Sequence, residues 1–238
     1  MENRFDRLNR LIGEENLLKL KNSRVAVFGC GGVGGYAIES LARSAIGELH
    51  LVDNDVFSIT NINRQILAVE NTMGRSKVEV AKERVLSINP EINVYTYPLF
   101  LLPSTEFPFD LGRMDYVLDC IDTVSAKLYL IASCKEKGVP ILSCMGCGNR
   151  LDPSQLRIDD IEKTEMDPLA KVIRKKCKDL GLRKVKVLYS LEKPLDPVIK
   201  ESKEGGGFRK DIPASSAFVP SAAGLLMGSY VVRELLKK

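Results

Sequence analysis

Residues 24–53 read RVAVFGCGGVGGYAIESLARSAIGELHLVD, and this stretch decides the fold class. A short β-branched run leads into a string of glycines, a segment with helical periodicity follows, and a second apolar run closes at Asp53. Short apolar runs bounded by glycine are typical of buried parallel strands. The order strand, glycine turn, helix, strand therefore predicts a βαβ unit.

The same alternation continues along the chain. Residues 4–21 predict two short helices separated by Gly13. Further elements are expected as helices over 74–88 and 125–138, and as strands within 89–100, 115–121 and 140–146. Strands that alternate with helices predict an α/β fold, a Rossmann-like, doubly wound and mostly parallel sheet with N-terminal helices.

The pattern weakens after residue 150. Expected there are a helix, a strand, a flexible crossing segment and a C-terminal helix, at 167–180, 185–190, 203–217 and 221–238. We expect a single domain over 1–238, with a nucleotide-binding core at 1–150 and a smaller substrate-facing extension at 151–238. The last apolar run is shorter than the ~20 residues of a membrane span, so no integral membrane span is expected.

Composition indicates an ordinary globular protein. Of 238 residues 45% are hydrophobic and 28% are charged, which suffices for a real core. The net charge of +4 permits a polyanionic partner without requiring one. No basic and apolar leader opens the sequence, so we expect a cytoplasmic protein whose six cysteines are reduced.

The glycine turn predicts a nucleotide site. Four glycines match the pattern GxGxxG between a strand and a helix: Gly29, Gly31, Gly32 and Gly34. Such glycines let phosphate approach the backbone at a helix N-terminus, and Asp53 can accept hydrogen bonds from ribose hydroxyls. A turn that serves only helix–sheet packing is the alternative. The motif does not distinguish NAD from ATP. A dehydrogenase often uses a histidine as its proton carrier. The single histidine, His50, lies within a predicted strand, which makes a dehydrogenase less favoured.

Residues 59–77, ITNINRQILAVENTMGRSK, add a second group of polar side chains: Asn61, Arg64, Gln65 and Lys77. Cations stabilise the negative charge that develops when a phosphate bond breaks, often with a metal ion. These residues therefore favour a nucleotide that is cleaved over one that is only held. A polar loop with solvated charges is the alternative.

Four motifs, GCGGVGG, LVDNDVFSITNINRQ, MGRSK and LDCID, resemble the ubiquitin-activating-enzyme superfamily of ThiF/MoeB-type adenylating enzymes. The resemblance implies that ATP and Mg²⁺ adenylate a carboxylate. It implies that Asp53 binds ribose, that Asn61, Arg64, Gln65 and Lys77 contact the nucleotide and its phosphates, and that Asp122 lies near Mg²⁺ and the reacting groups. It also implies that Arg7 reaches the ATP of a partner subunit in a homodimer, with Arg10 as a nearby substitute.

A narrower resemblance rests on RFDRLNRLIG, TNINRQI, INPEINV, GNRLDP and KTEMDPLAKVIRKK, which are similar to the bacterial tRNA threonylcarbamoyladenosine dehydratase family. It implies a tRNA substrate whose threonyl carboxylate is activated by ATP, after which the carbamoyl nitrogen closes a ring and expels AMP. Ring closure is intramolecular, so proximity supplies much of the rate. No cysteine nucleophile is then required.

Residues 171–186, KVIRKKCKDLGLRKVK, hold eight Lys or Arg residues in sixteen. We expect six of them to contact tRNA phosphates: Lys171, Arg174, Lys175, Lys176, Arg183 and Lys184. Such contacts would make binding salt-dependent. A solvated helix face is the alternative.

Three points stay open from sequence. Cys144 and Cys147 form one CxxC, interpreted as two small residues at a strand end, with a redox pair as the alternative and no structural zinc predicted because a second pair is absent. The other functions consistent with the motifs are activation of a ubiquitin-like sulfur-carrier protein, an NAD-dependent oxidoreductase and a non-catalytic nucleotide-binding module. Help from a sulfur-transfer protein partner is also left open.

Overall fold

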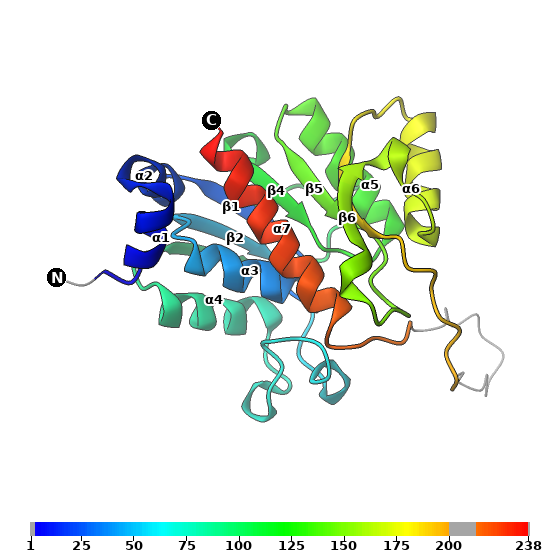
Figure 1. The fold of residues 1–238 in the computed structure, drawn as a ribbon, viewed down its shortest axis with the longest axis horizontal. Helices are drawn as coiled ribbons and strands as arrows, with labels where there is room; N and C mark the ends of the chain where they lie inside the picture. The colour runs from blue at the N-terminus through cyan, green and yellow to red at the C-terminus, as the bar shows by residue number, and fades with distance from the viewer. Residues whose placement is uncertain (1–2, 200–212, 238) are drawn as a thin grey trace.

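The computed structural model describes residues 3–199 and 213–237, and one seven-stranded sheet runs through it (Figure 1). The strand order is β3-β2-β1-β4-β5-β7-β6, in which only the edge strand β6 is antiparallel to its neighbour. The strands are β1 (Arg24–Phe28), β2 (Glu48–Val52), β3 (Asn93–Tyr97), β4 (Tyr116–Asp119), β5 (Ile141–Cys144), β6 (Leu156–Asp160) and β7 (Lys186–Ser190). The predicted α/β class with a mostly parallel sheet is confirmed.

The helices also follow the predicted pattern. They are α1 (Asp6–Ile12), α2 (Glu14–Lys21), α3 (Gly34–Arg43), α4 (Lys77–Ile88), α5 (Val124–Glu136), α6 (Pro168–Asp179) and α7 (Val219–Leu236). Gly13 separates the first two helices and has φ 85°, a left-handed conformation that a side chain disfavours. In the described part of the chain no helix is long and apolar enough to cross a membrane.

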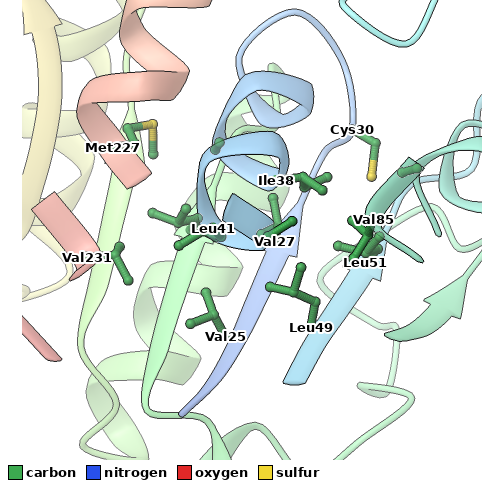
Figure 2. Packing of buried hydrophobic residues seen from close by; sticks show 14 of the residues in the cluster. Val25, Val27, Cys30, Ile38, Leu41, Leu49, Leu51, Val85, Met227 and Val231 are labelled. Atoms are coloured by element: carbon green, nitrogen blue, oxygen red, sulfur yellow. The ribbon is translucent and has the colours of Figure 1, made fainter. Parts of the chain in front are cut away.

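The alternation of side chains in the strands builds a core on each face of the sheet. In β1, Val25 and Val27 belong to a cluster that includes α3, α4 and α7, whereas Ala26 and Phe28 belong to a cluster that includes α5 and α6. Figure 2 shows the first cluster, in which Val27 lies among residues of β2 and of α3. Both faces are covered, which is why all four residues from Val25 to Phe28 in β1 are apolar and buried.

The C-terminal helix packs inside the domain. α7 lies along α3, and two of its glycines allow the close approach (Figure 1). A Cβ at Gly224 would lie 2.2 Å from the carbonyl oxygen of Val33, and one at Gly228 would lie 1.9 Å from Oγ of Ser40. The sequence alone predicts this helix but leaves its packing partner open.

Two features of the second half differ from the expected picture. Strand β6 was not predicted, although Leu156 and Ile158 alternate with polar residues and pair β6 with β7 in the same sheet. Most of the predicted crossing segment at 203–217 lies outside the described residues. The division into a core at 1–150 and an extension at 151–238 stays a prediction.

Candidate active site

A cavity of about 570 Å³ opens at the carboxyl end of the parallel strands. Its lining includes residues that directly follow β1, β2 and β4, the strands at the point where the sheet order changes direction. Ligands of open α/β sheets bind at such switch points, because crossovers leave to opposite faces there. The volume suits a small-molecule or nucleotide ligand.

The glycine turn has two different roles in this site. Gly31 and Gly32 line the cavity, and a Cβ at Gly31 would meet no protein atom nearer than Nε2 of Gln65 at 3.7 Å. A side chain there would occupy cavity space, so the turn fits a phosphate that approaches the backbone. Gly34 instead serves packing, because its Cβ would lie 1.7 Å from the carbonyl oxygen of Gly29. The nucleotide and packing interpretations therefore apply to different glycines of one motif.

Asp53 lies at the cavity wall directly after β2. Its Oδ2 accepts a hydrogen bond from the Cys30 amide at 2.6 Å, and its Oδ1 accepts one from the Asp55 amide at 2.8 Å. Burial raises the pKa of the Asp53 carboxyl, and the two amide hydrogen bonds offset only part of that effect. The carboxylate is thus held in a fixed position, and each oxygen can accept a further hydrogen bond from a ribose hydroxyl.

The cavity brings Asn61, Arg64, Gln65 and Lys77 together with Asp53. Asn61 and Gln65 are buried, and Oδ1 of Asn61 accepts a hydrogen bond from the Ser58 amide at 3.2 Å. Oε1 of Gln65 is buried and has no hydrogen-bond partner among the described residues. A buried amide oxygen without a partner is costly, so it favours a ligand that donates a hydrogen bond.

Both cations of this group are held at the cavity by local contacts. Nη1 of Arg64 donates to the Thr60 carbonyl at 2.7 Å and to Oδ1 of Asn63 at 2.9 Å. Nζ of Lys77 lies 2.8 Å from Oδ2 of Asp55, and only 8% of the Lys77 side chain is exposed. These contacts aim two positive charges at a space that could hold phosphates.

The loop after β4 supplies Asp122, which is exposed and lines the cavity. Its Oδ1 accepts a hydrogen bond from the Thr123 hydroxyl at 3.2 Å. At the base of the loop, Asp119 accepts hydrogen bonds from the Ile121 amide at 3.1 Å and from Nζ of Lys127 at 3.1 Å. Asp119 and Lys127 are fully buried, so this ion pair holds the start of the loop in place.

Several cavity residues were not found from sequence. They are Leu99, Phe100, Leu101, Cys147, Gly148, Pro213, Ser215 and Pro220, among others. Two of them carried a signal: Cys147 as part of the CxxC, and Gly148 as part of the glycine-rich MGCGN segment. The rest reach the cavity through the path of the chain, which a local pattern does not encode.

Arg7 lies outside the lining of the cavity. It is an exposed residue of α1. The neighbouring Arg4 donates to the carbonyl of Ile88, at the end of α4 that precedes β3. This contact places α1 at the amino end of the strands, away from the cavity.

The cysteines next to the cavity are thiols. Sγ of Cys144 and Sγ of Cys147 lie 3.5 Å apart, and all six cysteines are free. The hydrogen bond with Cys147 and burial raise the pKa of Cys144, and burial raises those of Cys30 and Cys120. Protonated thiols are poor nucleophiles and metal ligands. In residues 3–199 and 213–237 no group of three His, Cys, Asp or Glu residues could hold a metal ion, and the redox alternative stays untested.

The basic cluster, defined as Lys171, Arg174, Lys175, Lys176, Arg183 and Lys184, lies on α6 and the turn that follows it. Five of its members are exposed. Arg174 is partly buried, and its Nη1 donates to the carbonyl and to Oγ1 of Thr164. Arg174 therefore donates hydrogen bonds within the protein, and less of its guanidinium is open to a phosphate than in the exposed members.

Residues 5–188 match the model of the ThiF family. A tRNA threonylcarbamoyladenosine dehydratase of Bacillus subtilis is 46% identical over 247 residues, which span 100% of this chain and 96% of the relative. This chain belongs to the tRNA threonylcarbamoyladenosine dehydratase family, within the ThiF family. The enzyme of that name from Escherichia coli is 40% identical over 182 residues, covering 76% of this chain and 68% of the relative.

Solved structures agree with this assignment. The E. coli dehydratase in complex with AMP superposes with a TM-score of 0.87 at 32% identity, over 98% of this chain and 94% of that one. Its complex with ATP gives a TM-score of 0.85 at 31% identity over the same shares. The predicted family is therefore confirmed.

Proposed function

We propose that this dehydratase-family chain carries out the ATP-dependent dehydration of threonylcarbamoyladenosine in tRNA, through adenylation of the threonyl carboxylate. The observation that carries the proposal is one cavity whose lining combines an open glycine turn, Asp53, the cations Arg64 and Lys77, and Asp122. Relatives that share the family name, and a structural relative bound to ATP, support it.

The chemistry assigns each of these groups a task. A free carboxylate is a poor acyl donor, because its leaving group would be oxide. When a carboxylate oxygen bonds the α-phosphorus of ATP, pyrophosphate leaves, and the acyl adenylate that forms has AMP as its leaving group. Asp53 would bind ribose, and Asn61 and Gln65 would hydrogen-bond the nucleotide. Arg64 and Lys77 would stabilise the charge that develops as pyrophosphate departs. The neighbouring carbamoyl group would then close a ring on the activated carbonyl carbon and release AMP, an intramolecular step favoured by proximity.

Mg²⁺ belongs to the same proposal. The Asp122 carboxylate is exposed at the cavity and fits the usual way in which proteins hold Mg²⁺, by one or two carboxylates together with substrate phosphates. The ion would neutralise phosphate charge and orient the oxygens. Asp55, which is paired with Lys77, is less suited to bind it.

We further propose a homodimer in which Arg7 completes the site of the partner. Two facts support it: α1 lies away from its own cavity, and the α1–α2 pair exposes Leu11 and Leu18, with 82% and 57% of their surfaces accessible. Mixing inactive Arg7→Ala and Arg64→Ala enzymes should restore about a quarter of wild-type activity, because half of the dimers would hold one intact site. Absence of any recovery would refute completion in trans.

The exposed members of the basic cluster are proposed to bind tRNA phosphates, with Arg174 acting mainly through its contact to Thr164. A tRNA substrate also leads us to propose a cytoplasmic enzyme. Help from a sulfur-transfer protein partner stays untested.

The test is mass analysis of nucleosides after incubation with ATP, Mg²⁺ and tRNA that carries threonylcarbamoyladenosine. We expect loss of one water from that nucleoside, only with ATP and only with intact Arg64, so Arg64→Ala is run in parallel. An unchanged nucleoside together with pyrophosphate exchange on a sulfur-carrier protein would instead favour carrier activation. Binding of ATP without release of AMP would favour a non-catalytic module, and binding of nicotinamide would favour the oxidoreductase.

A further inference from the structure

A buried ion pair joins two parts of the chain next to the cavity. Nη2 of Arg150 lies 3.3 Å from Oδ2 of Asp167, and the side chains are 2% and 0% exposed. Taking two charges out of water largely offsets their attraction, so such a pair is a weak source of stability. The contacts of this pair instead fix the positions of the neighbouring backbone segments.

The pair holds both backbone groups of Gly146. Oδ2 of Asp167 accepts a hydrogen bond from the Gly146 amide at 3.1 Å, and Nη1 of Arg150 donates to the Gly146 carbonyl. The next two residues, Cys147 and Gly148, form part of the cavity wall. The position of this wall therefore depends on the two charged side chains.

The same carboxylate starts the basic helix. Oδ1 of Asp167 accepts a hydrogen bond from the Ala170 amide at 3.0 Å and so caps α6, with Pro168 as the first helical residue. One side chain thus bonds Gly146, next to the cavity wall, with one oxygen and the helix of the basic cluster with the other.

Arg150 extends the connection to two more segments. Its Nε donates to the Glu192 carbonyl at 3.1 Å, and its own carbonyl accepts a hydrogen bond from Oγ of Ser216 at 3.1 Å. The adjacent residue, Ser215, lines the cavity. Arg150 is therefore bonded to Gly146 and Ser216, and each of these residues is next to a residue that lines the cavity.

We propose that Arg150 and Asp167 are positioning residues that set the cavity wall relative to α6, so that a tRNA bound on the basic cluster presents its carboxylate to the nucleotide. This inference rests on the proposed function. Neither residue is assigned contact with substrate. Because a displacement of about 1 Å can cost ~100-fold in rate, loss of the pair should affect the reacting complex more than either binding step.

The test uses the double variant Arg150→Met/Asp167→Asn in the full chain. Methionine fills much of the space of Arg150 without a charge. Asparagine keeps one acceptor oxygen, which can still cap α6, while its NH2 group takes the place of the oxygen that accepts from the Gly146 amide. Measured are the ATP Kd, the tRNA Kd at fixed salt, and the single-turnover rate of dehydration with both saturating. We expect both Kd values to stay within about twofold of wild type while the rate falls at least tenfold, in the direction that misplacement predicts.

Two further variants separate positioning from folding. Arg150→Lys keeps the charge but cannot reach Asp167, Gly146 and Glu192 at once as the guanidinium does, and it should fold normally with a rate between wild type and the double variant. Glu39→Gln is the matched control, because it removes another buried charge, bonded to Arg43 and Arg84 between α3 and α4, away from the cavity wall. At temperatures below the melting temperature of the Glu39→Gln variant, its rate of dehydration should equal that of wild type.

A rate in the double variant equal to wild type, or one that falls only in proportion to its folded fraction, would overturn the inference. If the double variant fails to fold, Arg150→Lys decides, and an unchanged rate in that variant would also overturn it. Absence of dehydration by the wild-type enzyme would instead refute the proposed function, which keeps the two failures distinct.

Discussion

The change Lys77→Met removes one positive charge from the cavity and little else. Nζ of Lys77 lies 2.8 Å from Oδ2 of Asp55, and the side chain is 92% buried at the start of α4. Methionine keeps an unbranched apolar stem of similar length. Asp55, whose side chain is 59% exposed, can be hydrated once its partner is gone. We therefore expect the free energy of unfolding to fall by about 1 kcal/mol or less.

The effect on catalysis should be far larger. Loss of one preorganised group that stabilises developing charge costs ~100- to 1000-fold in kcat, or about 3–4 kcal/mol. The proposed role places the stabilised charge on departing pyrophosphate, so kcat should fall more than the KM for ATP rises. The assay is the initial rate of AMP release with modified tRNA, over a range of ATP concentrations.

Lys82→Met is the control for this prediction. Lys82 lies on the same helix, outside the lining of the cavity, and its replacement removes the same charge from the chain. We expect its kcat to be close to wild type. A decrease below about fivefold in Lys77→Met, or an equal decrease in both variants, would refute the assignment of Lys77 to transition-state stabilisation.

Three further predictions test other parts of the structure. Gly34→Ala would place a methyl group 1.7 Å from the Gly29 carbonyl oxygen, so thermal melting should show a loss above about 3 kcal/mol or no folded protein. Burial raises the pKa of Glu39, but its arginine hydrogen bonds outweigh this and lower it, so the excess stability of wild type over Glu39→Gln in urea unfolding should be complete near neutral pH and shrink below about pH 4. Lys175→Ala should weaken tRNA binding at low salt and reduce the slope of log K against log salt by about 1, whereas an unchanged slope would remove Lys175 from the interface.

Much of the fold was predictable because its signals are local. The apolar runs of β1 and β2, the glycine turn between them and the helical periodicity of α3 each lie within a few residues of one another. Such patterns report backbone geometry directly. Strand β6 escaped because its alternation is short and its partner, β7, lies about thirty residues further along. An antiparallel edge strand depends on that distant pairing more than on its own composition.

The candidate site was also predictable only in part. The sequence determined the order of the strands and helices other than β6, the glycine turn, and the polar residues that follow β2 and β4, because each is a short motif with a physical requirement of its own. Only the tertiary structure decided that Asn61, Arg64, Lys77 and Asp122 line one cavity. It also decided that Arg7 lies away from that cavity. Contacts between distant residues depend on how two sheet faces are covered and closed, and no local pattern carries that information.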